Sequence, residues 1–387
     1  MNVARELESS RLELPHLIGG ATTSRQHTAV KIAPEYASET VHVLDASRVV
    51  DVVSSLLDPA RRAALDVENR ELQERLRRQH AEKLKRPLLT LAEARANRAM
   101  LPFDDLPRPP FTGSREIDVA VSELVDYIDW QFFFHAWDLK GKFPALLDNP
   151  AARELYDDAR AVLDEIAQDG LLQARGVYGF WPARAEGDDV VVGEKRFSFL
   201  RQQAENGDSR PNRSLADFVA PDGDHVGGFA VSVHGADDVA AGHLAQHDDY
   251  QAIVVKALAD RLAEAFAEWL HERVRREWYA PREHFTRDEL IGERFRGIRP
   301  ALGYPACPDH SEKPKLLALL DADRAGITLT DAFAMLPAAA VSGLYFAHPQ
   351  SRYFAVGRIG RDQLADYAGR RGVSIDDAER WLSPSLA

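Results

Sequence analysis

An apolar stripe between Leu244 and Trp278 constrains the fold more than any other feature of the sequence. Hydrophobic residues recur there every three or four positions, at Val254, Leu258, Leu262, Ala265, Phe266 and Trp269. Residues at this spacing share one face of an α-helix, and other elements must cover such a face. The pattern therefore predicts one long helix at the centre of a large domain.

Short runs rich in β-branched and aromatic residues are expected to form strands that pack with this helix. The candidates are residues 176–181, 189–192, 229–233, 340–346 and 353–356. Helical stretches separate them, which is typical of an α+β fold. Residues 101–112 are rich in proline and predict an extended strap over the surface.

Residues 1–58 predict a separate unit with βαβα order. The elements are a helix from Asn2 to about Ser9, a strand within 14–18, a helix capped by Ser24, a strand at 41–44 and a helix over 48–57. Two strands are too few for a parallel sheet covered on both faces. We therefore expect the end of a larger domain here, followed by a helical linker at 59–85 and a second domain at 86–387.

Composition excludes several classes of function. The chain has 48 basic and 61 acidic residues, and the net charge of −13 repels nucleic-acid backbones. No window approaches the roughly 18 apolar residues that a membrane-spanning helix needs. The single cysteine, Cys307, excludes an internal disulfide and a multi-thiolate zinc site, which favours a reducing, cytoplasmic location.

Residues 299–310 form the most unusual stretch, because three prolines and a glycine within ten positions preclude regular structure. Arg299 offers a planar fork suited to a carboxylate, although a surface arginine on a packed loop is the simpler interpretation. Asp129 adjoins the aromatic cluster 130–134, which is expected to be largely buried. Asp129 either caps a helix or holds a cation at the edge of a cleft.

Three further motifs have simpler structural interpretations. Residues 223–228 contain half of an Asp-x-His-x-x-Gly motif that supplies an axial histidine to cobalt, but position 223 is glycine, so a chance match in a loop is expected. His247 and the two aspartates after it favour the first turn of a helix over a metal site. Cys307 lacks a neighbouring base other than His310 and is interpreted as structural.

Six segments together resemble the C-terminal part of cobalamin-dependent methionine synthase. They are residues 16–24, 27–34, 127–130, 246–250, 299–307 and 346–360. The resemblance implies that residues 1–58 end a cobalamin-binding domain with a Rossmann-like βαβα remnant. It also implies that residues 86–387 form a C-shaped reactivation domain with a twisted antiparallel sheet. In such methyltransferases of methionine biosynthesis, one electron from a flavodoxin-like donor and a methyl group from S-adenosylmethionine restore oxidised cobalamin.

The resemblance also implies site residues. It assigns S-adenosylmethionine contacts to Asp129, Glu264, Glu293, Arg299, Ala301, Tyr304, Tyr353 and Phe354. It assigns cobalamin contacts to Gly19, Gly20, Ala46 and His310. Arg299 would pair with the ligand carboxylate, and Asp129 with a positive or hydroxyl group. No catalytic side chain or metal ligand is expected, because the methyl group passes directly from sulfonium to cobalt.

The sequence departs from the family at several positions. Leu336 and Ala340 replace Trp and Ser, and Gln131-Phe132 replaces Thr-Pro. The zinc-bearing homocysteine domain, the folate domain and the axial-histidine part are missing, so the chain is not expected to complete the synthase cycle without a cobalamin-bearing domain or chain. The alternative is a stand-alone S-adenosylmethionine-binding module that docks on a separate cobalamin protein.

Overall fold

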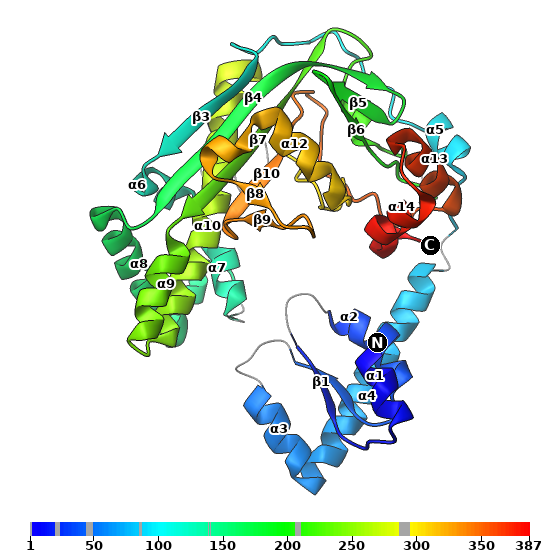
Figure 1. The fold of residues 1–387 in the computed structure, drawn as a ribbon, viewed down its shortest axis with the longest axis vertical. Helices are drawn as coiled ribbons and strands as arrows, with labels where there is room; N and C mark the ends of the chain where they lie inside the picture. The colour runs from blue at the N-terminus through cyan, green and yellow to red at the C-terminus, as the bar shows by residue number, and fades with distance from the viewer. Residues whose placement is uncertain are drawn as a thin grey trace. The chain divides into compact units, whose positions relative to one another are not determined.

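The structure is a computed structural model that divides into two compact units, Met1–Pro87 and Leu88–Ala387 (Figure 1). It describes residues 2–19, 24–43, 49–84, 87–137, 139, 141–205, 210–285 and 295–387. Gly20, Ala46 and Glu293 lie outside the described residues, so their implied ligand contacts stay predictions. Among the described helices, none is long and apolar enough to span a membrane.

The first unit contains two short parallel strands. β1 (His16–Ile18) pairs with β2 (Thr40–His42). The other elements are α1 (Asn2–Ser9), α2 (Arg25–His27), η1 (Thr28–Ile32), η2 (Ala33–Glu35), α3 (Val49–Leu57) and α4 (Pro59–Leu84). Ser24 caps α2 as predicted, because its hydroxyl accepts the His27 backbone N–H. The βαβα order is therefore present, while its origin in a cobalamin-binding domain stays a prediction.

The expected linker helix, α4, packs within the first unit. Gln73 donates to the Thr40 carbonyl at 2.6 Å, and Arg77 donates to the Ala29 carbonyl at 3.1 Å. These bonds connect α4 to β2 and η1. The boundary between the two compact units consequently follows the helix, at Pro87.

The second unit is built on an antiparallel sheet of six strands. Its order is β10 (Ala340–Tyr345), β7 (Asp224–His234), β4 (Gln173–Glu186), β5 (Asp189–Val192) and β6 (Lys195–Ser198). β3 (Gly113–Val119) also pairs with β4, along the half of β4 that precedes its pairing with β5. The curled sheet with its helices confirms the predicted α+β class (Figure 1).

Helices complete the second unit. They are α5 (Leu91–Ala96), α6 (Val121–Leu124), η4 (Val125–Tyr127), α7 (Trp130–Ala136), η5 (Ala145–Asp148), α8 (Pro150–Asp169), η6 (Leu215–Phe218), α9 (Ala236–Ala245), α10 (Asp249–Val274), η7 (Arg275–Tyr279), η8 (His310–Glu312), α12 (Lys313–Leu320), η9 (Ala322–Ala325), α13 (Arg361–Arg371), α14 (Ile375–Leu382) and η10 (Ser383–Ser385). A small hairpin joins β8 (Thr328–Leu329) and β9 (Met335–Leu336).

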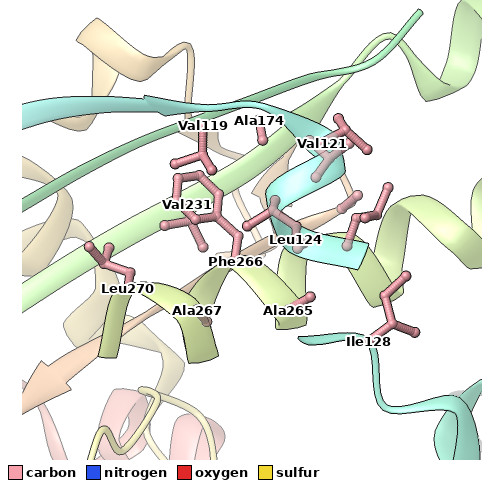
Figure 2. Close-up of a cluster of buried hydrophobic side chains, with 14 of the residues drawn as sticks. Val119, Val121, Leu124, Ile128, Ala174, Val231, Ala265, Phe266, Ala267 and Leu270 are labelled. Atoms are coloured by element: carbon pink, nitrogen blue, oxygen red, sulfur yellow. The ribbon is translucent and has the colours of Figure 1, made fainter. Parts of the chain in front are cut away.

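The sheet separates two hydrophobic cores, because alternate residues of a strand face opposite sides. Phe229 and Val231 of β7 join the core formed with α8 and α10, whereas Ala230 joins the core formed with α12. Figure 2 shows Phe266 and Leu270 of α10 in the first core, near Val231. The predicted central helix is therefore confirmed in its position.

The prediction that this helix is continuous from Leu244 to Trp278 is wrong. The helical structure is interrupted between α9 and α10. There, His247 has a positive φ of 61°, and Asp248 caps α10 by accepting the Gln251 backbone N–H. The predicted capping turn at 247–249 is confirmed. α10 is also followed by the wider π-helical turn η7, so one regular helix does not reach Trp278.

Other strand predictions need correction. Residues 353–356 are irregular, because the Val356 N–H bonds to the Pro305 carbonyl of another loop rather than to a strand. The motif at 223–228 lies mostly in β7, which begins at Asp224, so it is not a loop. β3 and β6 were not predicted. β3 contains several charged residues and few apolar ones, so its sequence resembles that of an exposed segment.

Candidate functional site

The proline-rich loop at 299–310 lies against β10. Ile298 and Phe346 exchange backbone hydrogen bonds of 3.1 and 3.0 Å, and Leu344 donates to the Pro300 carbonyl at 3.1 Å. A Cβ atom at Gly343 would lie 2.7 Å from that carbonyl oxygen. Glycine is therefore needed at 343 for the loop to approach the sheet this closely.

The loop also has an internal turn. Gly303 donates to the Cys307 carbonyl at 2.7 Å, and Cys307 donates to the Tyr304 carbonyl at 2.8 Å. Gly303 has a φ of +94°, and a Cβ there would lie 2.1 Å from the His310 ring. The loop lacks regular structure, as predicted, and these backbone hydrogen bonds hold its conformation. Burial raises the pKa of the Cys307 thiol well above its ordinary value, which supports a structural role.

Two cavities adjoin the loop and share Glu264, Arg299 and Tyr304 in their walls. The first, which we call the loop cavity, has a volume of about 460 Å³. The second, which we call the helix cavity, extends along α10 and has a volume of about 840 Å³. Cavities of this size hold small molecules in many proteins.

The cavities bring together most of the residues that the sequence singled out. Ala301, Tyr353 and Phe354 line the loop cavity, and Asp129 lines the helix cavity. His310 lines neither cavity and lies exposed in η8. Gly19 follows β1 in the first unit, where a Cβ would make only an ordinary contact with Val43. The structure therefore brings the described S-adenosylmethionine candidates together around the two cavities. The cobalamin contacts stay predictions.

Arg299 is the cation at the junction of the cavities. Its guanidinium lies 2.6 Å from the Glu268 carboxylate and donates to Nδ1 of His271 at 3.2 Å. Its backbone N–H donates to the Tyr353 hydroxyl at 3.0 Å. Burial opposes the charge, but the Glu268 carboxylate outweighs it and raises the pKa of Arg299. Arg299 therefore stays charged, with one side held by protein and one facing the cavities.

Carboxylates dominate the wall of the helix cavity. Asp126, Asp129, Glu264, Glu268 and Glu272 line it together with Arg261 and Arg299. Such a wall creates a negative potential in a partly enclosed space. Burial and then the nearby Glu264 carboxylate raise the pKa of Tyr304, so its hydroxyl stays protonated. The site suits a molecule with a positive centre near the acids and a carboxylate near Arg299.

Asp129 fits both sequence interpretations. Its carboxylate caps α7 by accepting the Gln131 backbone N–H at 2.9 Å, and it also lines the helix cavity. The neighbouring Phe133 and Phe134 are buried as expected, but Phe132 is 57% exposed, so that part of the burial prediction is wrong. Phe132 is directed into the rim of the helix cavity instead.

Glu268 and His271 were missed by sequence reasoning. They follow Glu264 by four and seven residues on α10, so all three share one face of the helix. The stripe of polar residues opposite the apolar face was the available signal. It was not used because exposed helix faces are commonly charged.

The fold and the cavities define a class of protein: an α+β domain with cavities of small-molecule size between a proline-rich loop and a central helix. A family model described as "Vitamin B12 dependent methionine synthase, activation domain" matches residues 120–372. A solved structure, "Crystal Structure of the MetH Reactivation Domain bound to AdoHcy", is 45% identical with a TM-score of 0.75. The alignment covers 78% of this chain and 99% of that chain.

The chain therefore belongs to the family of vitamin B12-dependent methionine synthase activation domains. Its second unit is a methionine synthase reactivation domain, the part that works with the cobalamin domain in that enzyme. The predicted family and the predicted fold of this unit are both confirmed.

Proposed function

We propose that this chain binds S-adenosylmethionine in the joined cavities and presents its methyl group for the reactivation of oxidised cobalamin. The observation that carries the proposal is that Arg299 lies in the walls of two adjoining cavities, one lined by two aromatic side chains and the other by carboxylates. The AdoHcy complex of the 45% identical reactivation domain supports the same ligand class. Family membership favours this function over a stand-alone binding module.

Arg299 fits the ligand carboxylate. Its side chain is 20% exposed and lines both cavities, beside Glu268. Arginine pairs with carboxylates through two parallel hydrogen bonds, which fixes orientation as well as position. Arg299 would therefore set the direction in which the rest of the ligand extends.

The acids fit the positive part of the ligand. Glu264 lies in both cavities, close enough to Tyr304 to raise its pKa. A sulfonium or ammonium centre beside this carboxylate gains Coulomb energy in a site of low effective dielectric constant. Asp129 has one carboxylate oxygen engaged in the α7 cap, and its other oxygen can accept a ligand hydroxyl. Glu293 is proposed only from the resemblance.

The aromatic side chains fit the flat ring of the ligand. Tyr353 and Phe354 line the loop cavity beside Pro300 and Ala301. Adenine stacks well on such apolar and aromatic surfaces. The protein would thus hold the ligand at both ends and leave the methyl group between them, which is the orientation that direct transfer requires.

The remaining part of the proposal concerns cobalamin. When bound, cobalamin supplies the reduced cobalt that accepts the methyl group, and a flavodoxin-like donor is proposed to supply the electron. Gly19, Gly20, Ala46 and His310 stay candidate contacts. Zinc is proposed only for other modules of the family. The second unit itself would orient the donor and exclude water, without a protein nucleophile.

Isothermal titration of the full chain with S-adenosylmethionine and with AdoHcy tests the proposal. We expect saturable binding, reduced about 100-fold by Arg299→Ala and less by Arg299→Lys, which keeps charge but loses the fork. Arg184→Ala is the matched control, because Arg184 is half-exposed on β4 and pairs with Glu186 away from the cavities. Absence of binding, or equal losses in the Arg299→Ala and Arg184→Ala variants, would contradict the proposal.

A further inference from the structure

We propose that His271 is a positioning residue that holds the Arg299 guanidinium in the direction required to receive the carboxylate of the ligand. The inference rests on the proposed function and adds a residue that touches Arg299 rather than the ligand. Its basis is a buried chain of contacts from Arg299 through His271 to Tyr279.

The ring of His271 is held in place by the residues packed around it. Its side chain is fully buried. The ring stacks on Tyr345 with centroids 5.4 Å apart and planes at 14°, and it meets the edge of Phe295 at 5.1 Å. Rings packed on two sides cannot turn freely. The nitrogen that faces Arg299 is therefore held still.

The hydrogen bonds define one tautomer. Arginine has donors and no acceptor, so Nδ1 of His271 must accept the bond from Arg299. Nε2 then carries the proton and donates a hydrogen bond to the Tyr279 hydroxyl, which lies 3.0 Å away. Burial, with the positive charges of Arg299 and Arg275, holds the pKa of His271 well below its ordinary value. The neutral ring can therefore keep its acceptor near neutral pH.

The bond to His271 fixes the plane of the Arg299 guanidinium, which the ion pair with Glu268 does not fix. The Glu268 carboxylate pairs with Nη2 of Arg299, and carboxylate pairing alone permits several planes of the fork. The bond from Nη1 to His271 fixes a second point, and the Tyr353 hydroxyl holds the backbone of the same residue. The two contacts from α10 determine the plane of the guanidinium, which matters for bidentate recognition, and the contact from Tyr353 fixes the backbone that carries it.

Two substitutions separate positioning from packing. His271→Phe keeps a ring for Tyr345 but removes the acceptor, whereas His271→Asn keeps an acceptor near the place of Nδ1 but removes the ring. Each variant is titrated with AdoHcy and with 5′-methylthioadenosine, which lacks the amino-acid carboxylate. Tryptophan fluorescence during denaturation provides the stability of each variant.

We expect His271→Phe to weaken AdoHcy binding by about ten- to 100-fold and to change methylthioadenosine binding by about two-fold or less. His271→Asn should bind AdoHcy more tightly than His271→Phe, even if it is the less stable variant. Equal losses for both ligands, or unchanged AdoHcy binding in His271→Phe, would overturn the inference and leave the proposed function standing. Failure of the unaltered chain to bind AdoHcy overturns both.

A second measurement needs no ligand. Nitrogen-15 NMR of the histidine rings in the full chain distinguishes the two neutral tautomers and the protonated form. We expect His271 to show a protonated Nε2 and a bare Nδ1 from about pH 8 down to about pH 5.5. A proton on Nδ1, or protonation of the ring near its ordinary pKa, would contradict the positioning role.

Discussion

Two buried arginines of the second unit, Arg201 and Arg275, are both 1% exposed and have very different surroundings. Arg201 donates to Asp188, to both carboxylate oxygens of Asp217 and to the Asn212 carbonyl, at 2.7 to 2.9 Å. Arg275 lies 3.4 Å from Glu283 and 3.9 Å from Glu268, over the ring of Phe295. Its guanidinium nitrogens have no hydrogen-bond partner within the described ranges.

The two environments have different roles. The residues around Arg201 form a frame of alternating charges between β5, η6, α5 and α13, to which Arg95, Asp366 and Arg370 also belong. The residues around Arg275 adjoin the helix cavity, because Glu268 is one of its lining residues. There, Oε1 of Glu268 and the Tyr345 hydroxyl are also buried without a hydrogen-bond partner in the described part of the chain. Saturated groups stabilise a fold, whereas polar groups with spare capacity are typical of functional sites.

The largest expected effect is on the frame. Arg201→Met leaves Asp188 and Asp217 buried without their main cation and should lower the free energy of unfolding by about 3 to 5 kcal/mol. All six tryptophans lie between residues 130 and 381, so their fluorescence during urea denaturation reports on the second unit. The control is Arg361→Ala, which removes an exposed ion pair with Glu379 and should change nothing measurable. Similar stability of the two variants would contradict the frame.

A smaller effect is expected at Arg275. Arg275→Met removes a cation–π contact and two long ion pairs, while it also removes a desolvated charge. We expect a loss of about 1 to 2 kcal/mol in the same denaturation experiment. A loss as large as that of Arg201→Met would show that the two arginines are equally important to stability.

The smallest effect is on the pH dependence of stability. Burial holds the pKa of His271 well below 6.5. As the pH falls through 6.5, His271 therefore becomes protonated in the unfolded chain but stays neutral in the folded protein. Stability should therefore fall by about 1 kcal/mol between about pH 7 and pH 5.5, and His271→Phe should remove that part of the slope.

The frame titrates in a more acidic window. Burial raises the pKa of Asp366, but hydrogen bonds from Arg95 and Arg370 outweigh it and lower that pKa below 3.8. The contribution of Asp366 to stability is present above pH 3.8 and is lost as the pH falls through the lowered pKa.

Denaturation curves at a series of pH values check the pH ranges expected for His271 and for Asp366. An unchanged slope between pH 7 and pH 5.5 in His271→Phe would contradict the account of His271.

Local patterns predicted much of the fold because they are written in neighbouring residues. The apolar repeat of α10 and the short apolar runs of β5 and β10 identified these elements before their partners were known. The strand expected at 353–356 failed for the opposite reason. Its aromatic and β-branched residues fit a strand, but the Val356 N–H bonds to the Pro305 carbonyl, and that contact depends on tertiary structure.

The site was predicted in part for related reasons. The resemblance singled out Arg299 and the aromatic pair, and the structure places them around one space. Glu268 and His271 carry no motif, and their meaning depends on a loop about 30 residues away that turns back onto α10. The partners of Arg201 are likewise set by packing, because nothing in their spacing distinguishes them from surface charges.

The central claim is that the cavities at Arg299 bind the methyl donor by its amino-acid end. A crystal structure of this chain with AdoHcy tests it most directly. We expect the ligand carboxylate within about 3 Å of the Arg299 guanidinium, the thioether near Glu264 and the adenine beside Tyr353 and Phe354. A ligand bound outside the two cavities, or one whose carboxylate is directed away from Arg299, would contradict the account.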